Sequence, residues 1–208
     1  MIRVGINGLG RIGRAILRSN MNKKMFTIVA VNDINPEIEN IAYTLNYDTL
    51  YDQIDDKFIC NHHEIYNSQG AIKIFHEKHI DEVDWESLDV DFVIDSSGVY
   101  DNVVRAKSAI EKNNLKKIIV THSPNEHVDF TMVLGANEEL LDIDKHHVIS
   151  SSICDATAIG PVLKTIKDYF GIESGFVTTM HPWLSYQNLM DGPASSWSVP
   201  GEIYHHYA

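Results

Sequence analysis

The chain has 208 residues, 44% of them hydrophobic and 22% charged, which is the composition of an ordinary globular protein. Its 29 acidic residues outnumber 17 basic ones, and the formal net charge of -12 excludes nucleic acid and anionic membrane surfaces as natural partners. No apolar run approaches the ~20 residues of a membrane span, and only two cysteines occur, so we expect a cytoplasmic protein without a disulfide framework.

Apolar β-branched runs alternate with helical patterns along the first 150 residues. The predicted elements in chain order are strand 2–6, helix 11–21, strand 26–32, helix 36–45, strand 92–95, helix 102–112 and strand 117–121. This alternation predicts an α/β fold whose parallel sheet is covered by helices on both faces. Residues 46–91 carry turn signals and strand-like pieces such as Ala71–Phe75, which predicts an antiparallel excursion.

A second region is expected after residue 150. The serines at 150–152 are candidate N-caps of a helix predicted from Cys154 to Phe170, and Gly171 suits the residue that closes it. A strand is predicted at 172–181, whereas the following residues show little periodicity. The expected domains are residues 1–150 and 151–208.

A glycine motif, Gly8-Leu9-Gly10-Arg11-Ile12-Gly13, follows the first strand and opens the first helix. In such a motif the first glycine permits a sharp turn, the second admits a pyrophosphate against bare backbone, and the third lets the helix pack on the strand. Asp33 stands 20 residues after Gly13, where a carboxylate grips the hydroxyls of a ribose. The motif therefore predicts a Rossmann-type, doubly wound sheet that binds a dinucleotide.

The residues around Asp33 favour NAD over NADP. A carboxylate repels a 2′-phosphate, and the neighbouring Ile34 and Asn35 provide no cation to hold one. The later run Ser96-Ser97-Gly98 stands at a strand end, where it either contributes to the same crevice or forms a simple turn from strand to helix.

Cys154 stands at the predicted start of a helix, where the helix dipole and unpaired N–H groups stabilise a thiolate. His181 ends the following strand and is a candidate partner that orients the thiol and accepts its proton. Together they suit attack on an aldehyde, hydride transfer to NAD and formation of a thioester. An inert core cysteine and a structural histidine are the alternatives, and Asp155 opposes thiolate formation.

These motifs together resemble the glyceraldehyde-3-phosphate dehydrogenase family, along essentially the whole chain. The segments that carry the resemblance are Val4–Arg14, Val31–Asp33, Ala42–Asp48, Ser96–Tyr100, Ser152–Cys154, Phe170–Ile172, Thr178–His181 and Asp191–Pro193. The resemblance implies that the Rossmann-type sheet is followed by the start of an α+β catalytic domain. It also implies Cys154 as nucleophile, His181 as its base, and a homotetramer.

The resemblance and the glycine motif together give a set of expected cofactor-binding residues. These are Asn7, Gly8, Gly10, Arg11, Ile12, Gly13, Asp33, Lys78, Ser97, Gly98 and Thr121. For Lys78 and Thr121 only the resemblance raises them above a solvated lysine and a strand-end threonine. Adjacent histidines elsewhere in the chain lack the paired spacing of a zinc site, so no metal ligands are expected.

The chain departs from the family around the nucleophile. The family reads Ser-Cys-Thr-Thr-Asn-Cys, whereas this chain has Asp155-Ala156 in place of the two threonines that help to hold phosphate. Losing anion donors and gaining a carboxylate indicates an aldehyde other than a phosphate ester, or an NAD-binding pseudoenzyme that acts as a sensor or assembly partner. Because family members have about 330 residues, the resemblance also implies an incomplete second domain, so that the fragment alone is expected to lack activity.

Overall fold

The computed structural model describes residues 1–122, 124 and 126–180. It divides into two compact units, Met1–Gly171 and Ile172–Ala208, of which the second is described only up to Met180. Within these described ranges, no helix combines the length and the apolar character needed to cross a bilayer.

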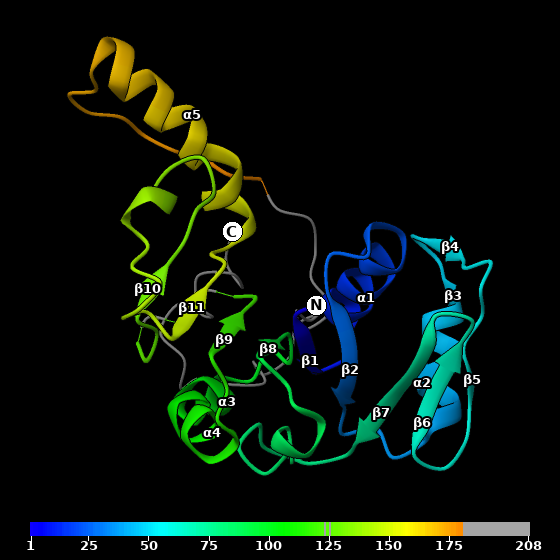
Figure 1. The fold of residues 1–208 in the computed structure, drawn as a ribbon. Coiled ribbons are helices and arrows are strands. Elements are labelled where there is room, and N and C mark those ends of the chain that lie inside the picture. The colour runs from blue at the N-terminus through cyan, green and yellow to red at the C-terminus, as the bar shows by residue number, and fades with distance from the viewer. Residues whose placement is uncertain (123, 125, 181–208) are drawn as a thin grey trace, which may run out of the picture. The chain divides into compact units, whose positions relative to one another are not determined.

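Nine strands of the described residues form one sheet (Figure 1). They are β1 (Arg3–Asn7), β2 (Thr27–Asn32), β5 (Ile59–Cys60), β6 (Glu64–Asn67), β7 (Gly70–Phe75), β8 (Phe92–Asp95), β9 (Lys117–Val120), β10 (Phe130–Thr131) and β11 (Val148–Ser150). Their order is β10-β11-β9-β8-β1-β2-β7-β6-β5, and only the β5–β6 and β6–β7 pairs are antiparallel. A separate hairpin joins β3 (Tyr47–Asp48) to β4 (Asp52–Gln53). The predicted α/β fold with a mainly parallel sheet is confirmed.

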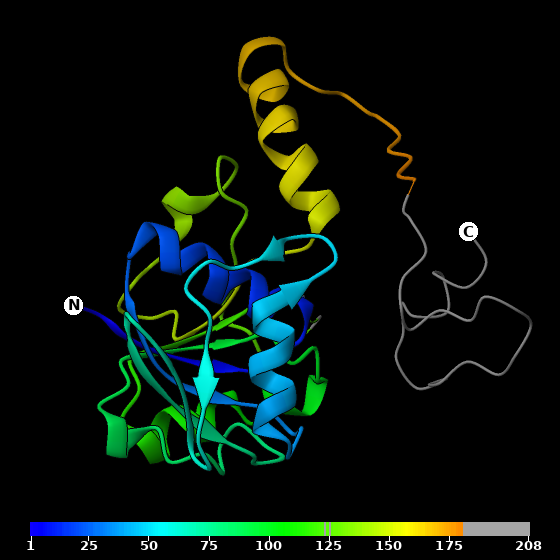
Figure 2. The ribbon, with the colours of Figure 1, turned by 90° about the vertical axis from the view of Figure 1, so that its right-hand side faces the viewer.

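Helices cover both faces of this sheet (Figures 1 and 2). The covering helices are α1 (Arg11–Lys23), α2 (Ile38–Asn46), α3 (Tyr100–Val104) and α4 (Ala106–Asn113), whereas α5 (Cys154–Phe170) extends away from the sheet and has no buried residue. One apolar cluster joins Leu17 of α1 and Leu45 of α2 to Val31, whereas the other joins α3 and α4 to Ala30 and the fully buried Trp85. Adjacent residues of β2 thus serve opposite cores, because successive side chains of a strand point to opposite faces.

The strand order reverses beside β1. From β1 the chain passes through α1 to β2 on one side, whereas β8 pairs with the other side of β1. Open α/β sheets bind ligands in the crevice at the carboxyl ends of the strands on either side of such a switch point. Gly8 follows β1 and Ser96 follows β8, so both predicted loops flank the crevice.

Two predictions within the first domain need correction. The strand predicted at 71–75 belongs to an antiparallel hairpin as expected, but β7 also joins the main sheet parallel to β2 because Ile72 and Ile74 pack into its core. The single helix predicted at 102–112 is two helices. Arg105 interrupts it with ψ of -4°, a tightened turn, and its guanidinium pairs with Asp101 and Asp81.

The second region also differs from the prediction. Helix α5 has the predicted bounds, and Gly171 closes it with φ of 75° and an N–H bonded to Lys167 O. None of the three serines caps it, since the N-cap is Ile153 and the Ser150 hydroxyl instead donates to His122 O at 2.6 Å. The strand predicted at 172–181 is absent from residues 172–180, because this exposed segment has no partner strand among the described residues to satisfy its backbone.

Candidate functional site

The glycine loop after β1 has a distinct geometry at each glycine. Gly8 adopts φ of 88°, and a Cβ there would lie 2.6 Å from the backbone of Ser97. A Cβ on Gly13 would collide with the carbonyl oxygen of Gly8, so this glycine allows the helix to pack on the loop. A Cβ on Gly10 would meet no atom within 4 Å among the described residues, so the space above this residue is open.

The start of α1 suits a pyrophosphate. Gly10 is its N-cap residue, and no side chain among the described residues caps the helix. The first N–H groups of a helix lack partners within the helix, and its dipole favours negative charge at this end. Bare backbone, open space and an uncapped helix N-terminus are what an anionic diphosphate requires, so the residues fit this part of a dinucleotide. Arg11 and Ile12 form the exposed first turn.

Asp33 lies at the carboxyl end of β2, directly beside the glycine loop. Its Oδ2 accepts the Leu9 N–H at 2.7 Å and its Oδ1 accepts the Asn35 N–H at 2.9 Å. Each carboxylate oxygen has a second lone pair, so the group is held in place and can still accept from a ribose hydroxyl.

A chain of buried polar side chains connects the carboxyl ends of β2, β1 and β8. Asn32 Nδ2 donates to Asn7 Oδ1 at 2.8 Å, and Asn7 Nδ2 donates to Asp95 Oδ1 at 2.9 Å. The three side chains are at most 3% exposed. Beyond Asn32 the chain continues to the backbone of Glu77, which both donates to and accepts from the amide. Asn7 therefore joins the glycine loop to β2 and β8 through its side chain.

The loop after β8 is fixed by hydrogen bonds to Asp95, the last of these buried side chains. The Ser97 hydroxyl donates to Asp95 Oδ1 at 2.7 Å and accepts from Val99 N and Asn102 Nδ2. Ser96 Oγ donates to the carbonyl of Gly8 at 2.6 Å, which ties the two loops together. The Ser97 side chain is thus committed to the loop, and Gly98, with φ of 69° and open space around it, provides the bare backbone.

The two remaining predicted cofactor residues, Thr121 and Lys78, follow strands β9 and β7. Thr121 follows β9, where its N–H bonds Asp95 O at 3.0 Å, so it faces the same edge of the sheet. Lys78 is exposed on the segment after β7.

Two buried atoms near Asp95 find no hydrogen-bond partner among the described residues, Asp95 Oδ2 and His122 Nδ1. Burial lowers the pKa of His122, and the negative charge of Asp95 opposes this shift. Sequence reasoning missed His122, although it follows Thr121 directly. It also missed His76, which follows the last residue of β7.

Cys154 is the first residue of α5 and is exposed. Helix α5 follows β11, which is parallel to β9, so the thiol comes after the carboxyl edge of the sheet that carries the other predicted residues. Its Sγ lies 3.7 Å from Asp155 Oδ1. The predicted partner His181 lies outside the described residues.

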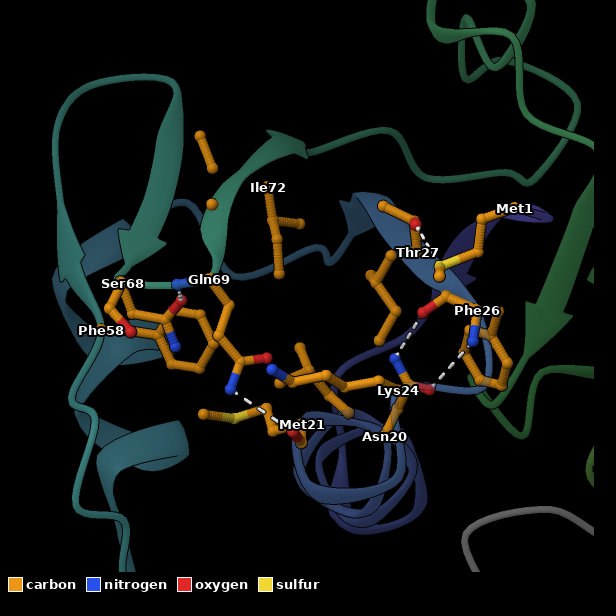
Figure 3. Close-up of a pocket in the computed structure, with 15 residues that line it drawn as sticks. Met1, Asn20, Met21, Lys24, Phe26, Thr27, Phe58, Ser68, Gln69 and Ile72 are labelled. Atoms are coloured by element: carbon orange, nitrogen blue, oxygen red, sulfur yellow. Dashed lines mark hydrogen bonds between the residues drawn. The ribbon is translucent and has the colours of Figure 1, made fainter.

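A pocket of about 470 Å³ lies away from this site (Figure 3). Its lining comes from the end of α1, the start of β2 and the β6–β7 hairpin, including Met21, Thr27 and Gln69. Because β2 begins there, the pocket is at the amino end of the strand, opposite the cofactor loop.

The buried imidazole predicts a pH dependence of stability. An unfolded imidazole takes up a proton near pH 6.5, whereas the lowered pKa of His122 makes the folded protein resist protonation. The unfolded state therefore binds more protons below that pH, and stability falls as the pH falls. We expect His122→Gln to reduce the loss of unfolding free energy between about pH 7.5 and about pH 5.5 by up to about 1 kcal/mol, measured by urea denaturation. An equal loss in both proteins would contradict this assignment.

Two family models match this chain. The model for "Glyceraldehyde 3-phosphate dehydrogenase, NAD binding domain" matches residues 2–103, and the model for "Glyceraldehyde 3-phosphate dehydrogenase, C-terminal domain" matches residues 152–199. The two matched ranges thus correspond to successive domains of one family.

Curated relatives agree with the family models. Glyceraldehyde-3-phosphate dehydrogenase 1 of Streptomyces avermitilis is 34% identical over 193 residues, and glyceraldehyde-3-phosphate dehydrogenase of Thermotoga maritima is 35% identical over 195 residues. These alignments cover 92% and 93% of this chain and 57% of each relative, so the chain spans little more than half the length of the relatives it matches. Glyceraldehyde-3-phosphate dehydrogenase 2 of Bacillus subtilis is 31% identical, over 92% of this chain and 56% of the relative. The chain belongs to the glyceraldehyde-3-phosphate dehydrogenase family, with NAD as its cofactor.

Proposed function

We propose that the protein is an NAD-dependent aldehyde oxidoreductase that acts through the thiol of Cys154. The observation that carries this proposal is the position of an exposed cysteine at the first residue of α5, after the sheet edge that holds the glycine loop. A thiol at a helix N-terminus is favoured as a thiolate, which is the nucleophilic form.

The cofactor loop has a defined part in this proposal. The backbone from Gly10 to Gly13 binds the pyrophosphate, and Asp33 accepts from the ribose of the adenosine half. Bound NAD supplies the hydride acceptor. The Asn7–Asp95 hydrogen bond and the loop from Ser96 to Gly98 hold the crevice in shape, so that little reorganisation is needed when the cofactor binds.

The chain's own chemical step is addition of the Cys154 sulfur to the carbonyl carbon of an aldehyde. The family resemblance assigns His181 as the base that takes the thiol proton. In the first turn of α5 the half-buried carboxylate of Asp155 lies 3.7 Å from the sulfur, where it repels an anionic substrate. The proposed substrate is therefore an aldehyde without a phosphate group, and faster turnover of glyceraldehyde 3-phosphate than of such an aldehyde would contradict this choice.

The same carboxylate favours a second candidate function, an NAD-binding pseudoenzyme that serves as a sensor or assembly partner. A negative charge beside the sulfur opposes thiolate formation, so chemistry is lost while the cofactor loop is kept. The family resemblance supports a cytoplasmic homotetramer under either proposal.

We expect Gly10→Ala to weaken NAD binding by at least about tenfold, with a loss of stability of no more than about 1 kcal/mol because alanine is a poorer N-cap than glycine. The added methyl group enters the open space that the pyrophosphate needs, and the φ of -67° at this residue suits alanine. Calorimetric titration with NAD and thermal unfolding measure the two effects separately.

Gly175→Ala is the control, because among the residues that the structure describes a Cβ there also meets no atom within 4 Å and its backbone does not need glycine. We expect this variant to bind NAD normally. Unchanged NAD affinity in Gly10→Ala would remove the glycine loop from the cofactor site.

The reactivity of Cys154 separates the two candidate functions. An oxidoreductase is expected to show half-maximal alkylation of this thiol well below pH ~8.5, where an ordinary cysteine ionises. Mass spectrometry of the full-length protein, alkylated across a range of pH, gives this value for each cysteine. Cys60 is the internal reference, because burial raises the pKa of its thiol.

The variant Asp155→Asn tests the role of the neighbouring charge. Removing a carboxylate 3.7 Å from the sulfur should move alkylation of Cys154 to lower pH. An ordinary titration of Cys154 in both proteins would support the pseudoenzyme and exclude the oxidoreductase.

A further inference from the structure

A histidine stands beside the carboxylate that selects the cofactor. Strands β2 and β7 are parallel, with Asn32 opposite Phe75, so the next residues, Asp33 and His76, are neighbours at the carboxyl edge. The Asp33 N–H donates to Phe75 O at 3.0 Å, and His76 Nδ1 lies 3.0 Å from Asp33 O. The imidazole is thus held against the backbone of Asp33.

This contact leaves the charge of the ring variable. A carbonyl oxygen only accepts hydrogen bonds, so Nδ1 carries a proton in this contact and Nε2 is the nitrogen that gains or loses one. The His76 side chain is exposed. The hydrogen bond from Nδ1 therefore does not depend on whether Nε2 carries a proton.

Three charged residues adjoin His76 in register or in sequence. Asp33 faces it from β2, and Glu77 and Lys78 follow it on its own segment, both exposed. The charges of Glu77 and Lys78 are opposite and offset each other. A proton on His76 would therefore offset the negative charge of Asp33.

We propose that His76 is a specificity residue for the cofactor, which weakens the discrimination of Asp33 against a 2′-phosphate when its imidazole is protonated. In this proposal the 2′ position of an adenosine ribose held by the Asp33 carboxylate lies near the ring that contacts the Asp33 backbone oxygen. A cation near the ribose is the feature by which dinucleotide sites accept a 2′-phosphate. The inference rests on NAD binding at Asp33 and is independent of the chemistry at Cys154.

The test compares the affinities of NAD and NADP for the full-length protein at about pH 8 and about pH 5.5, on either side of the ionisation of a free imidazole. We expect the NAD-to-NADP affinity ratio to fall about threefold to fivefold more in the wild type than in His76→Gln, the range for an exposed charge pair. The 2′-phosphate also titrates near pH 6, but it does so equally in both proteins.

Two further variants make the result specific. His147→Gln removes another exposed imidazole whose Nδ1 lies 3.3 Å from a backbone oxygen, but at the amino end of β11, and it should behave as the wild type. His76→Arg carries a positive charge at both pH values. After correction for the 2′-phosphate titration measured in His76→Gln, its NAD-to-NADP affinity ratio should be as low at about pH 8 as at about pH 5.5. The same pH dependence in wild type and His76→Gln would overturn the inference while leaving NAD binding intact, whereas loss of NAD binding in all variants would overturn the cofactor site as well.

Discussion

The site depends on the hydrogen-bonded chain from Asn32 through Asn7 to Asp95. These three side chains are at most 3% exposed and connect the carboxyl ends of three parallel strands. A buried amide or carboxylate without a partner costs about 1–3 kcal/mol or more, so the chain fixes which side chains meet at this edge. It thereby sets the positions of the glycine loop, of Asp33 and of the loop after β8.

The hydrogen-bonded side chains also set the charge at the carboxyl edge of the sheet. Asp95 is a fully buried carboxyl group that accepts from Asn7 and Ser97 through one oxygen, while its other oxygen has no partner among the described residues. His122 Nδ1, which follows β9, is likewise buried without a partner in the part of the chain that the structure describes. Buried polar atoms without a partner are rare in native proteins, and two of those found within the described ranges, Asp95 Oδ2 and His122 Nδ1, belong to residues at this edge of the sheet.

The sequence alone was sufficient for the parts of the fold that local pattern controls. The glycine motif, its strand and its helix lie where the spacing predicts, because Gly8, Gly10 and Gly13 each meet a distinct local requirement. Long-range pairing was less accessible: β7 joins β2 in parallel, and the Ser150 hydroxyl bonds His122 rather than capping α5. For the same reason the hydrogen bonds of Asn7 and Ser97 to Asp95 were not foreseen, and His76 was overlooked because only register places it beside Asp33.

The central claim is that the loop from Gly8 to Gly13 and the carboxylate of Asp33 hold NAD at the switch point of the sheet. A crystal structure of the full-length protein with NAD tests it most directly. The pyrophosphate is predicted to lie over Gly10, bonded to backbone N–H groups at the start of α1, with a hydroxyl of the adenosine ribose on Asp33. NAD bound with its pyrophosphate away from this loop, or with the ribose away from Asp33, would contradict the account.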